Sequence, residues 1–327
     1  MDIPFVSVII PVRNEGLILR QCLQSLVQLD YPRDRIEIII ADGKSTDNTA
    51  AVAREFGCVV VTNERKLVGS GRNIGFQHSQ GEFVAFTDAD CLFDPHWLKK
   101  GVAHFSDPCI GGVGGKTLTP SHGSNFEKAV DFLFRGADAV SSTSHRQRDE
   151  KTHTVRDLPG CNCIYRREAL RQVMPVDENL LTAEDVWMNY CLRDRGALLL
   201  YDPQVIVWHH RRNSPKRFLR QMYRFAIGRL QVAKKSSQLI NVFHVLAAFS
   251  IPLLALLVWE AIRVGALVFF VCASAGVVCF MMAMALFQYR SFRVAGYVPV
   301  MLVLFCIGWS AGFLREFFIP MRDAQGK

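Results

Sequence analysis

Short apolar runs alternate with segments of helical spacing along the first part of the chain. The apolar runs predict buried strands at Val6–Pro11, Ile36–Ile40, Cys58–Thr62 and Glu82–Phe86. Helices are predicted at 17–29, at 49–56 and from Gly69 onward. Strands that alternate with helices are typical of a parallel α/β sheet with right-handed crossovers. Ligands of such sheets bind outside the carboxyl ends of the strands, so we expect functional residues there.

The C-terminal part of the chain is membrane-like. Asp, Glu, Lys and Arg are all missing from three stretches, at about 241–259, 264–287 and 294–314. Each stretch is long enough to span a hydrocarbon core of about 30 Å. The basic residues before Asn241 and at Arg290 and Arg293 fall on one side, which the positive-inside rule places in the cytosol, with the C-terminus outside. A buried helical hairpin within a soluble domain is the alternative.

Composition narrows the class of protein. Half of the 327 residues are hydrophobic, and a chain of this length suggests about two structural units. The formal charge of +8 is compatible with nucleic acid or with an anionic membrane face, and the apolar tail favours the membrane. The ten cysteines include no Cys-x-x-Cys pair, so we expect a reducing compartment and neither a disulfide framework nor a zinc site.

Two carboxylates, Asp88 and Asp90, follow the fourth predicted strand. Residues two apart on an extended chain point the same way, so these side chains would lie side by side. Two like charges held close together are costly unless a cation joins them. Mg²⁺ and Mn²⁺ prefer oxygen ligands and often share them with phosphates, so a metal held by a diphosphate fits the pair. A solvated turn at a strand end is the alternative.

Two further loops carry candidate binding residues. Asp42 follows the second predicted strand and precedes residues 45–47, which can cap the next helix or form a turn, so Asp42 is not needed as the cap and is a candidate ligand-binding residue. The glycine-rich segment Gly69–Gly75 opens a helix, a geometry that suits an anion, and Arg72 within it is a candidate diphosphate contact. A plain helix start is the alternative. The polar stretch 141–153 is compatible with a mobile acceptor-side loop or with a surface insertion.

Four motifs occur in order at Val8–Glu15, Ala41–Thr49, Arg72–Gly75 and Asp88–Asp90. Together they resemble the nucleotide-sugar-binding half of the family 2 glycosyltransferases, which have the Rossmann-like GT-A fold with a mostly parallel sheet. The resemblance implies a metal, Mg²⁺ or Mn²⁺, at Asp88 and Asp90. It also implies donor binding by Pro11, Asn14, Glu15, Asp42, Arg72 and Asp88. One departure is visible, because the family commonly has Asp-Asp-Gly-Ser where this chain has Asp42-Gly43-Lys44-Ser45.

The acceptor side is carried by two later motifs. The segment Leu158–Leu170 resembles the family's acceptor-side strand and the helix after it. By the resemblance, Asp185 is the base that takes the proton of the acceptor hydroxyl during inverting transfer, and Glu184 is an acceptor or structural partner. A helix N-terminus is the alternative, because Thr182 and Asp185 have the spacing of a capping box.

A strand-like run ends in His209 and His210, and the basic segment 211–229 follows. The resemblance suggests that one histidine, His209 rather than His210, joins the metal; a structural histidine is the alternative. Gln221 and Arg224 resemble the Gln-x-x-Arg-aromatic motif of membrane-bound members, in the form found in succinoglycan-type exopolysaccharide transferases. Such a helix would bring its arginines to lipid phosphates and to the donor diphosphate, whereas a basic stop region beside the membrane is the alternative.

We therefore predict a GT-A catalytic domain at 1–210, a basic amphipathic interfacial region at 211–238 and a transmembrane region with three helices at 239–327. The predicted function is metal-assisted inverting transfer of a sugar from a nucleotide-diphosphate sugar to a lipid-linked, polyprenyl-phosphate or polysaccharide-precursor acceptor. It would occur at the cytosolic face of the plasma membrane, without nucleic acid. The alternatives are a polyprenyl-phosphate sugar synthase, a processive polysaccharide synthase and, outside the enzymes, a membrane-tethered nucleotide-binding scaffold.

Overall fold

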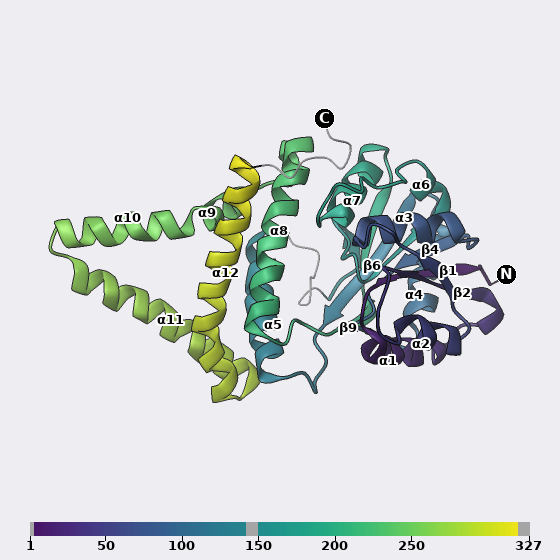
Figure 1. Cartoon of the computed structure of the whole chain (residues 1–327), viewed down its shortest axis with the longest axis horizontal. Helices are drawn as coiled ribbons and strands as arrows, with labels where there is room; N and C mark the ends of the chain where they lie inside the picture. Colours follow the sequence, from purple (N-terminus) through teal and green to yellow (C-terminus); the bar gives the residue numbers. More distant parts are fainter. Residues whose placement is uncertain (1–2, 142–149, 320–327) are drawn as a thin grey trace. The chain divides into compact units, whose positions relative to one another are not determined.

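The computed structural model describes residues 3–141 and 150–319, which fall into two compact units (Figure 1). The first unit holds the described residues up to Pro120 and from 150 to His210. The second holds those from Ser121 to 141 and from Arg211 to 319. Residues 121–141 therefore group with the C-terminal helices, although they lie within the range predicted for the catalytic domain. Most of the predicted polar loop at 141–153 lies outside the described residues.

The first unit is built on a mixed sheet of nine strands in the described part of the chain, in the order β3-β2-β1-β4-β8-β6-β9-β5, with β7 beside β9. The strands are β1 (Val6–Val12), β2 (Ile36–Asp42), β3 (Val59–Thr62), β4 (Phe83–Phe86), β5 (Cys91–Phe93), β6 (Ile110–Leu118), β7 (His153–Thr154), β8 (Cys163–Arg166) and β9 (Leu198–His209). The four strands β3, β2, β1 and β4 are parallel, and β8 runs antiparallel to both β4 and β6. The predicted α/β class is confirmed.

Helices cover both faces of this sheet (Figure 1). They are α1 (Gly16–Val27), α2 (Thr49–Glu55), α3 (Val68–His78), α4 (Trp97–Ala103), α6 (Arg167–Arg171) and α7 (Glu184–Asp194). Alternation along β1 sends Val8 and Ile10 into the core layer that contains α1, α2 and α4, and sends Ile9 into the layer with α3, α6 and α7. Because both faces are buried, the strands read as continuous apolar runs rather than as alternating ones.

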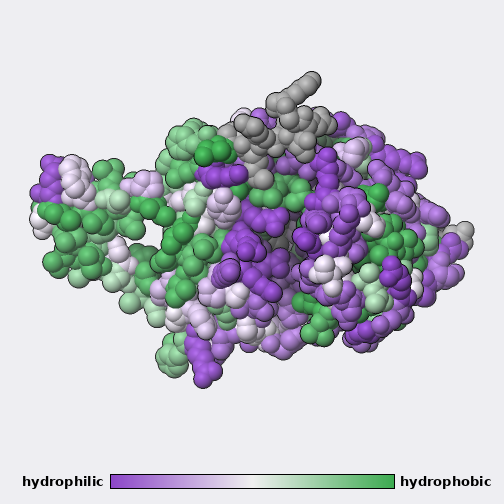
Figure 2. Space-filling model, in the orientation of Figure 1, coloured by the Kyte–Doolittle hydropathy of each residue, from purple (hydrophilic) through white to green (hydrophobic). Residues whose placement is uncertain are grey.

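The second unit is helical. Its helices are α5 (Asn125–Ser141), α8 (Pro215–Lys235), α9 (Val242–Ala248), α10 (Ser250–Arg263), α11 (Leu267–Tyr289) and α12 (Phe292–Phe318). An apolar cluster that includes Phe126, Phe218 and Met301 joins α5, α8 and α12. Among the described residues, α11 and α12 are long and apolar enough to cross a membrane, and α9 with α10, bent by 65°, would make a third span if counted together. Figure 2 shows apolar residues gathered over α10, α11 and α12.

Gly75 is a position at which the packing of a helix on the sheet admits no side chain. A Cβ atom added at Gly75, in α3, would collide with Cγ2 of Ile9 on β1, whereas one added at Gly136, in α5, would meet nothing within 4 Å. We expect Gly75→Ala to lower the free energy of unfolding by about 1–3 kcal/mol through overpacking. Gly136→Ala should raise it by up to about 1 kcal/mol through helix propensity. Denaturant unfolding of the purified protein in detergent measures both, and equal shifts would contradict this account of α3.

Candidate active site

Two strand pairings bring Asp90 to His209. The parallel pairing of β4 with β1 ends at Phe86 opposite Ile9, and the chain then leaves the sheet through Asp88. It re-enters as β5, which pairs antiparallel with β9 so that Cys91 lies opposite His209. As a result, Nε2 of His209 lies 3.0 Å from Oδ1 of Asp90 and 4.0 Å from Oδ2 of Asp88.

The site favours added positive charge. Desolvation raises the pKa of Asp88 well above its usual value, and the neighbouring Cys161 and Asp90 raise it further. Burial alone would lower the pKa of His209, but the carboxylate of Asp90 and the thiol of Cys161 outweigh it and raise the pKa to about 10. The two shifts share one contribution, the acidic groups of Asp90 and Cys161, whereas burial raises the pKa of Asp88 and opposes the rise for His209.

The donor atoms suit a hard divalent cation. Two carboxylates and one imidazole converge, and oxygen and nitrogen ligands of this kind hold Mg²⁺ and Mn²⁺. Sγ of Cys91 also lies within 4.8 Å of ligand atoms of Asp90 and His209. Cys91 is nevertheless fully buried in the core layer of α1, and burial raises the pKa of its thiol far above the usual value. Thiolate is a soft ligand that Mg²⁺ and Mn²⁺ disfavour, so Asp90 and His209 are the better ligands of this group, and Oδ2 of Asp88 lies 4.0 Å from Nε2 of His209.

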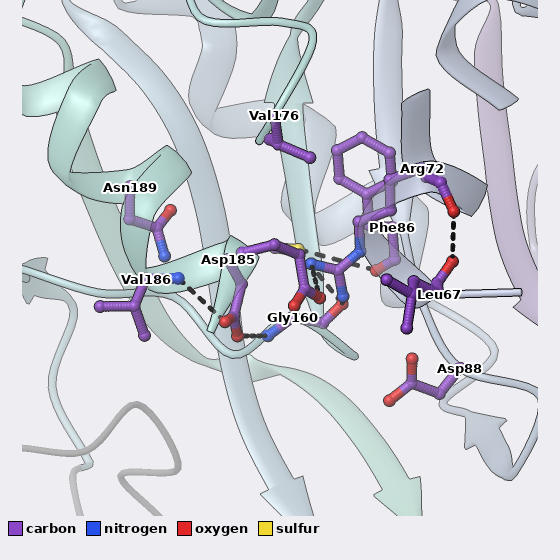
Figure 3. Close-up of polar contacts among 12 residues, drawn as sticks. Leu67, Arg72, Phe86, Asp88, Gly160, Val176, Asp185, Val186 and Asn189 are labelled. Atoms are coloured by element: carbon purple, nitrogen blue, oxygen red, sulfur yellow. Dashed lines mark hydrogen bonds and ion pairs between the residues drawn. The ribbon is translucent and has the colours of Figure 1, made fainter. Parts of the chain in front are cut away.

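A second acidic group lies at the first turn of α7, where the chain carries Glu184 and Asp185. The residue before them, Ala183, has φ 65° and ψ 21°, the left-handed conformation that residues other than glycine rarely adopt. Oδ1 of Asp185 accepts a hydrogen bond from the N–H of Val186 at 2.9 Å, and Oδ2 accepts one from the N–H of Gly160 at 3.1 Å (Figure 3). These bonds set the direction of the Asp185 carboxylate.

The other acid, Glu184, is paired inside the protein. Nη1 of Arg72, on α3, lies 3.0 Å from Oε1 of Glu184, and both side chains are less than a tenth exposed. Nη2 of Arg72 donates to the carbonyl oxygen of Gly160 at 3.0 Å, and its guanidinium lies over the ring of Phe86 (Figure 3). Burial would lower the pKa of Arg72, but the charges of Glu184 and Asp185 raise it, so the group stays charged.

The loop Gly160–Cys161 links the two acidic groups. Gly160 donates to Asp185, as described above. The next residue, Cys161, accepts a hydrogen bond from Oγ1 of Thr87 at 2.9 Å through its carbonyl oxygen, and its Sγ lies 3.8 Å from Nδ1 of His209. Adjacent residues have Cα atoms about 3.8 Å apart. One short loop therefore contacts Asp185 on one side and the Asp88–Asp90–His209 cluster on the other.

The loops after β1 and β2 are bonded to one another. Oδ1 of Asn14 accepts from the N–H of Thr46 at 2.8 Å, and the N–H of Glu15 donates to Oγ1 of Thr49 at 3.0 Å. The oxygens of Asp42 accept from the N–H and the hydroxyl of Ser45. Asp42 therefore shapes its own turn, and it remains partly exposed at the carboxyl end of β2.

The first unit thus brings together the two acidic groups predicted from widely separated motifs. Gln221 and Arg224 lie one turn apart on α8 of the second unit, where both are half-buried. Sequence reasoning missed Gly160 and Cys161 as site residues. The Pro159-Gly160 dipeptide is a turn signal that marks this loop, but nothing in it names the partners of the loop.

Comparisons with known proteins identify the family and the fold of this chain. A family model described as Glycosyl transferase family 2 matches residues 7–174. The glycosyltransferase AglE of Haloferax volcanii is 28% identical over 238 residues, which cover 70% of this chain and 74% of that protein. The dolichyl N-acetyl-alpha-D-glucosaminyl phosphate 3-beta-D-2,3-diacetamido-2,3-dideoxy-beta-D-glucuronosyltransferase of Methanococcus voltae is 26% identical over 278 residues, or 81% of this chain and 83% of that protein.

Among solved structures, the mannosyltransferase PcManGT from Pyrobaculum calidifontis, in complex with GDP-Man and Mn²⁺, superposes with a TM-score of 0.64. It is 21% identical, and the match covers 93% of this chain and 88% of that one. A likeness at this level of identity concerns the fold, and it confirms the predicted GT-A architecture.

The buried pair of Arg72 and Glu184 should matter far more for stability than an exposed pair. We expect Glu184→Gln to lower the free energy of unfolding by about 3 kcal/mol, because it leaves the buried guanidinium without its closest counter-charge. The matched control is Glu55→Gln, which breaks the 2.6 Å pair with Arg20 on the surface and should leave the unfolding midpoint almost unchanged. Denaturant unfolding measures both variants. A Glu184→Gln protein as stable as the control would show that the Arg72–Glu184 pair does not support the fold.

Proposed function

Because the chain belongs to glycosyl transferase family 2, we propose that Asp185 is the base of an inverting sugar transfer and that Asp88, Asp90 and His209 hold the metal of the donor. The family assignment makes the chain a glycosyltransferase that takes its sugar from a nucleotide sugar. We further propose the roles of individual residues, the acceptor and the membrane face described below.

One observation carries the proposal. Gly160 and Cys161 are consecutive residues, and they contact Asp185 and His209 respectively. A base and a donor site held by neighbouring residues of one loop are close enough for a single reaction to involve both. An acceptor hydroxyl beside Asp185 would then face the anomeric carbon of a sugar whose diphosphate is held near Asp90.

The pairing of Glu184 supports the choice of Asp185 as the base. Glu184 is buried and its carboxylate is already engaged by Arg72 at 3.0 Å, so it is not accessible to an incoming hydroxyl. Asp185 is partly exposed. In the proposed step the acceptor oxygen forms a bond to the anomeric carbon, the bond from that carbon to the diphosphate breaks, and the hydroxyl proton passes to Asp185.

The metal would be Mg²⁺ or Mn²⁺, and when bound it supplies positive charge that stabilises the departing nucleoside diphosphate. The chain's own contribution is to gather two carboxylates and an imidazole after the end of β4. The raised pKa of Asp88 indicates that this group of side chains would be stabilised by an added cation. Pro11, Asn14, Glu15 and Asp42 would bind the nucleoside, and Arg72, Gln221 and Arg224 would meet the diphosphate. For Arg72, whose guanidinium is buried against Glu184, a contact with the diphosphate stays a prediction.

The proposed acceptor is a lipid-linked sugar or a polyprenyl phosphate at the cytosolic membrane face. Apolar residues exposed along α10 and α11 support attachment to a membrane. The name of the Methanococcus voltae relative describes a dolichyl-linked acceptor, which is consistent with such a substrate class. Basic residues along α8 are suited to anionic lipid headgroups.

The donor site can be tested by binding. We expect a nucleoside diphosphate to raise the thermal unfolding midpoint of the full chain when Mn²⁺ is present and to have little effect without it. Asp90→Asn should abolish that dependence and the transfer reaction, because it removes one of the two carboxylates that favour the cation. The control is Asp30→Asn, which changes an exposed carboxylate on the loop after α1. A full Mn²⁺ response in Asp90→Asn would remove the metal assignment.

The base can be tested by separating binding from transfer. We expect Asp185→Asn to keep the nucleotide-dependent shift of the unfolding midpoint while transfer to a lipid-phosphate acceptor falls by about 10²–10⁴-fold, the usual contribution of a general base. Asp194→Asn, an exposed change at the other end of α7, is the matched control and should keep both. If Asp185→Asn loses donor binding together with transfer, Asp185 has a structural role and the proposed mechanism fails.

A further inference from the structure

Helix α12 lies along the basic helix α8 for most of its length. Phe218 and Met222 of α8 share an apolar cluster with Met301, and Ala226 and Leu230 share the next cluster with Trp309 and Phe313. The contacts advance in the same order along both helices, so the two run parallel. Figure 1 shows α8 and α12 side by side within the second unit.

Two kinds of contact make this pairing close. A Cβ atom added at Gly308 would lie 2.8 Å from the carbonyl oxygen of Leu219, and one added at Gly312 would collide with the backbone of Tyr223. Farther along, Nζ of Lys234 donates to Oε1 of Glu316 at 2.8 Å and to its carbonyl oxygen at 3.0 Å, and Glu316 is 2% exposed. The backbones therefore touch, and a buried acid binds the two C-terminal ends together.

Helix α8 is unsuited to the interior of a bilayer. It carries basic residues along its whole length and no acid, at Lys216, Arg217, Arg220, Arg224, Arg229, Lys234 and Lys235. A basic side chain near the centre of a membrane costs free energy. Only basic residues near a helix end can extend far enough to place their charge among the headgroups. If α12 crossed the bilayer, α8 would have to cross beside it, with Arg220, Arg224 and Arg229 inside.

The hairpin of α10 and α11 has the opposite character. In the most apolar 18-residue stretch of α11 no residue is buried, whereas 39% of the corresponding stretch of α12 is buried. Val268, Phe269 and Phe280 are among its exposed residues. Three residues join α10 to α11, with Gly265 at φ 73°, and the charged groups at this tip, Glu260 and Arg263, are paired at 2.6 Å. In Figure 1 the hairpin extends away from α12.

We propose that the chain enters the bilayer only through the α10–α11 hairpin, while α8 and α12 lie together on an anionic lipid surface. The basic residues of α8 meet the headgroups, and the exposed apolar residues of α12, Val300, Val303 and Ile307, meet the acyl chains. The end of α12 then lies on the same side of the membrane as α8. The third predicted span, at 294–314, would instead place it on the opposite side.

Protease protection in sealed vesicles distinguishes the two topologies. For this test the full chain carries one epitope before Met1 and another after Lys327. The vesicles are oriented so that the N-terminal epitope faces the outside solution. We expect protease to remove both epitopes without detergent, and to remove an epitope inserted at Gly265 only after detergent. A protected C-terminal epitope beside a cleaved N-terminal one would overturn the proposal, and so would cleavage at Gly265 in intact vesicles.

The pairing of α8 with α12 in the membrane is tested separately. We expect a carbodiimide to join Lys234 to Glu316 as an amide in vesicles, because Nζ of Lys234 on α8 lies 2.8 Å from Oε1 of Glu316 on α12. The control is the E316Q variant, which has no carboxylate at this position for the reagent to activate. Crosslinking no greater than in the control would show that α12 has left α8, which would also overturn the proposal.

Discussion

The buried ion pair of Arg72 and Glu184 is the constraint on which the candidate site depends. Two charges taken out of water must satisfy one another, so α3 and the start of α7 cannot move apart without a large cost. The same guanidinium donates to the carbonyl oxygen of Gly160, whose N–H donates in turn to Asp185. A side chain at Gly160 would meet both Arg72 and Asp185, so only glycine fits between them. The direction of the proposed base therefore follows from a residue on a different helix.

The sheet explains why the two acidic groups share one region. The parallel strands β1, β2 and β4 end at the same edge, which places Asp42 and the Asp88–Asp90 segment there. The antiparallel strand β8 lies beside β4 and brings the loop Gly160–Cys161 to the same edge. The proposed inverting transfer needs a base on one side of the sugar and a held diphosphate on the other, and in this proposal the mixed sheet would supply both from a single edge.

The predictions from sequence succeeded where local pattern decides the structure. The apolar runs correctly predicted β1, β2 and β4, because a short, continuous apolar run is typical of a strand that is buried on both faces. They could not show that β8 inserts between β4 and β6, since that pairing joins residues far apart in the chain. The partner of Glu184 was missed for the same reason. Hydropathy predicted α12 as a membrane span but could not show that α8 packs against it. The hydropathy of one segment contains no information about its neighbour in the fold.

The backbone at Ala183 limits which residues the start of α7 can accept. A left-handed conformation costs an ordinary residue about 1–2 kcal/mol, and a β-branched residue suffers most from crowding at its Cβ. Glycine, asparagine and aspartate tolerate it best, so the spectrum of substitutions at this position should be narrow and biased toward these three. A laboratory selection for activity would then enrich these residues at position 183, next to the two acids. It would do so because of the backbone conformation, although the side chain at this position takes no part in the chemistry.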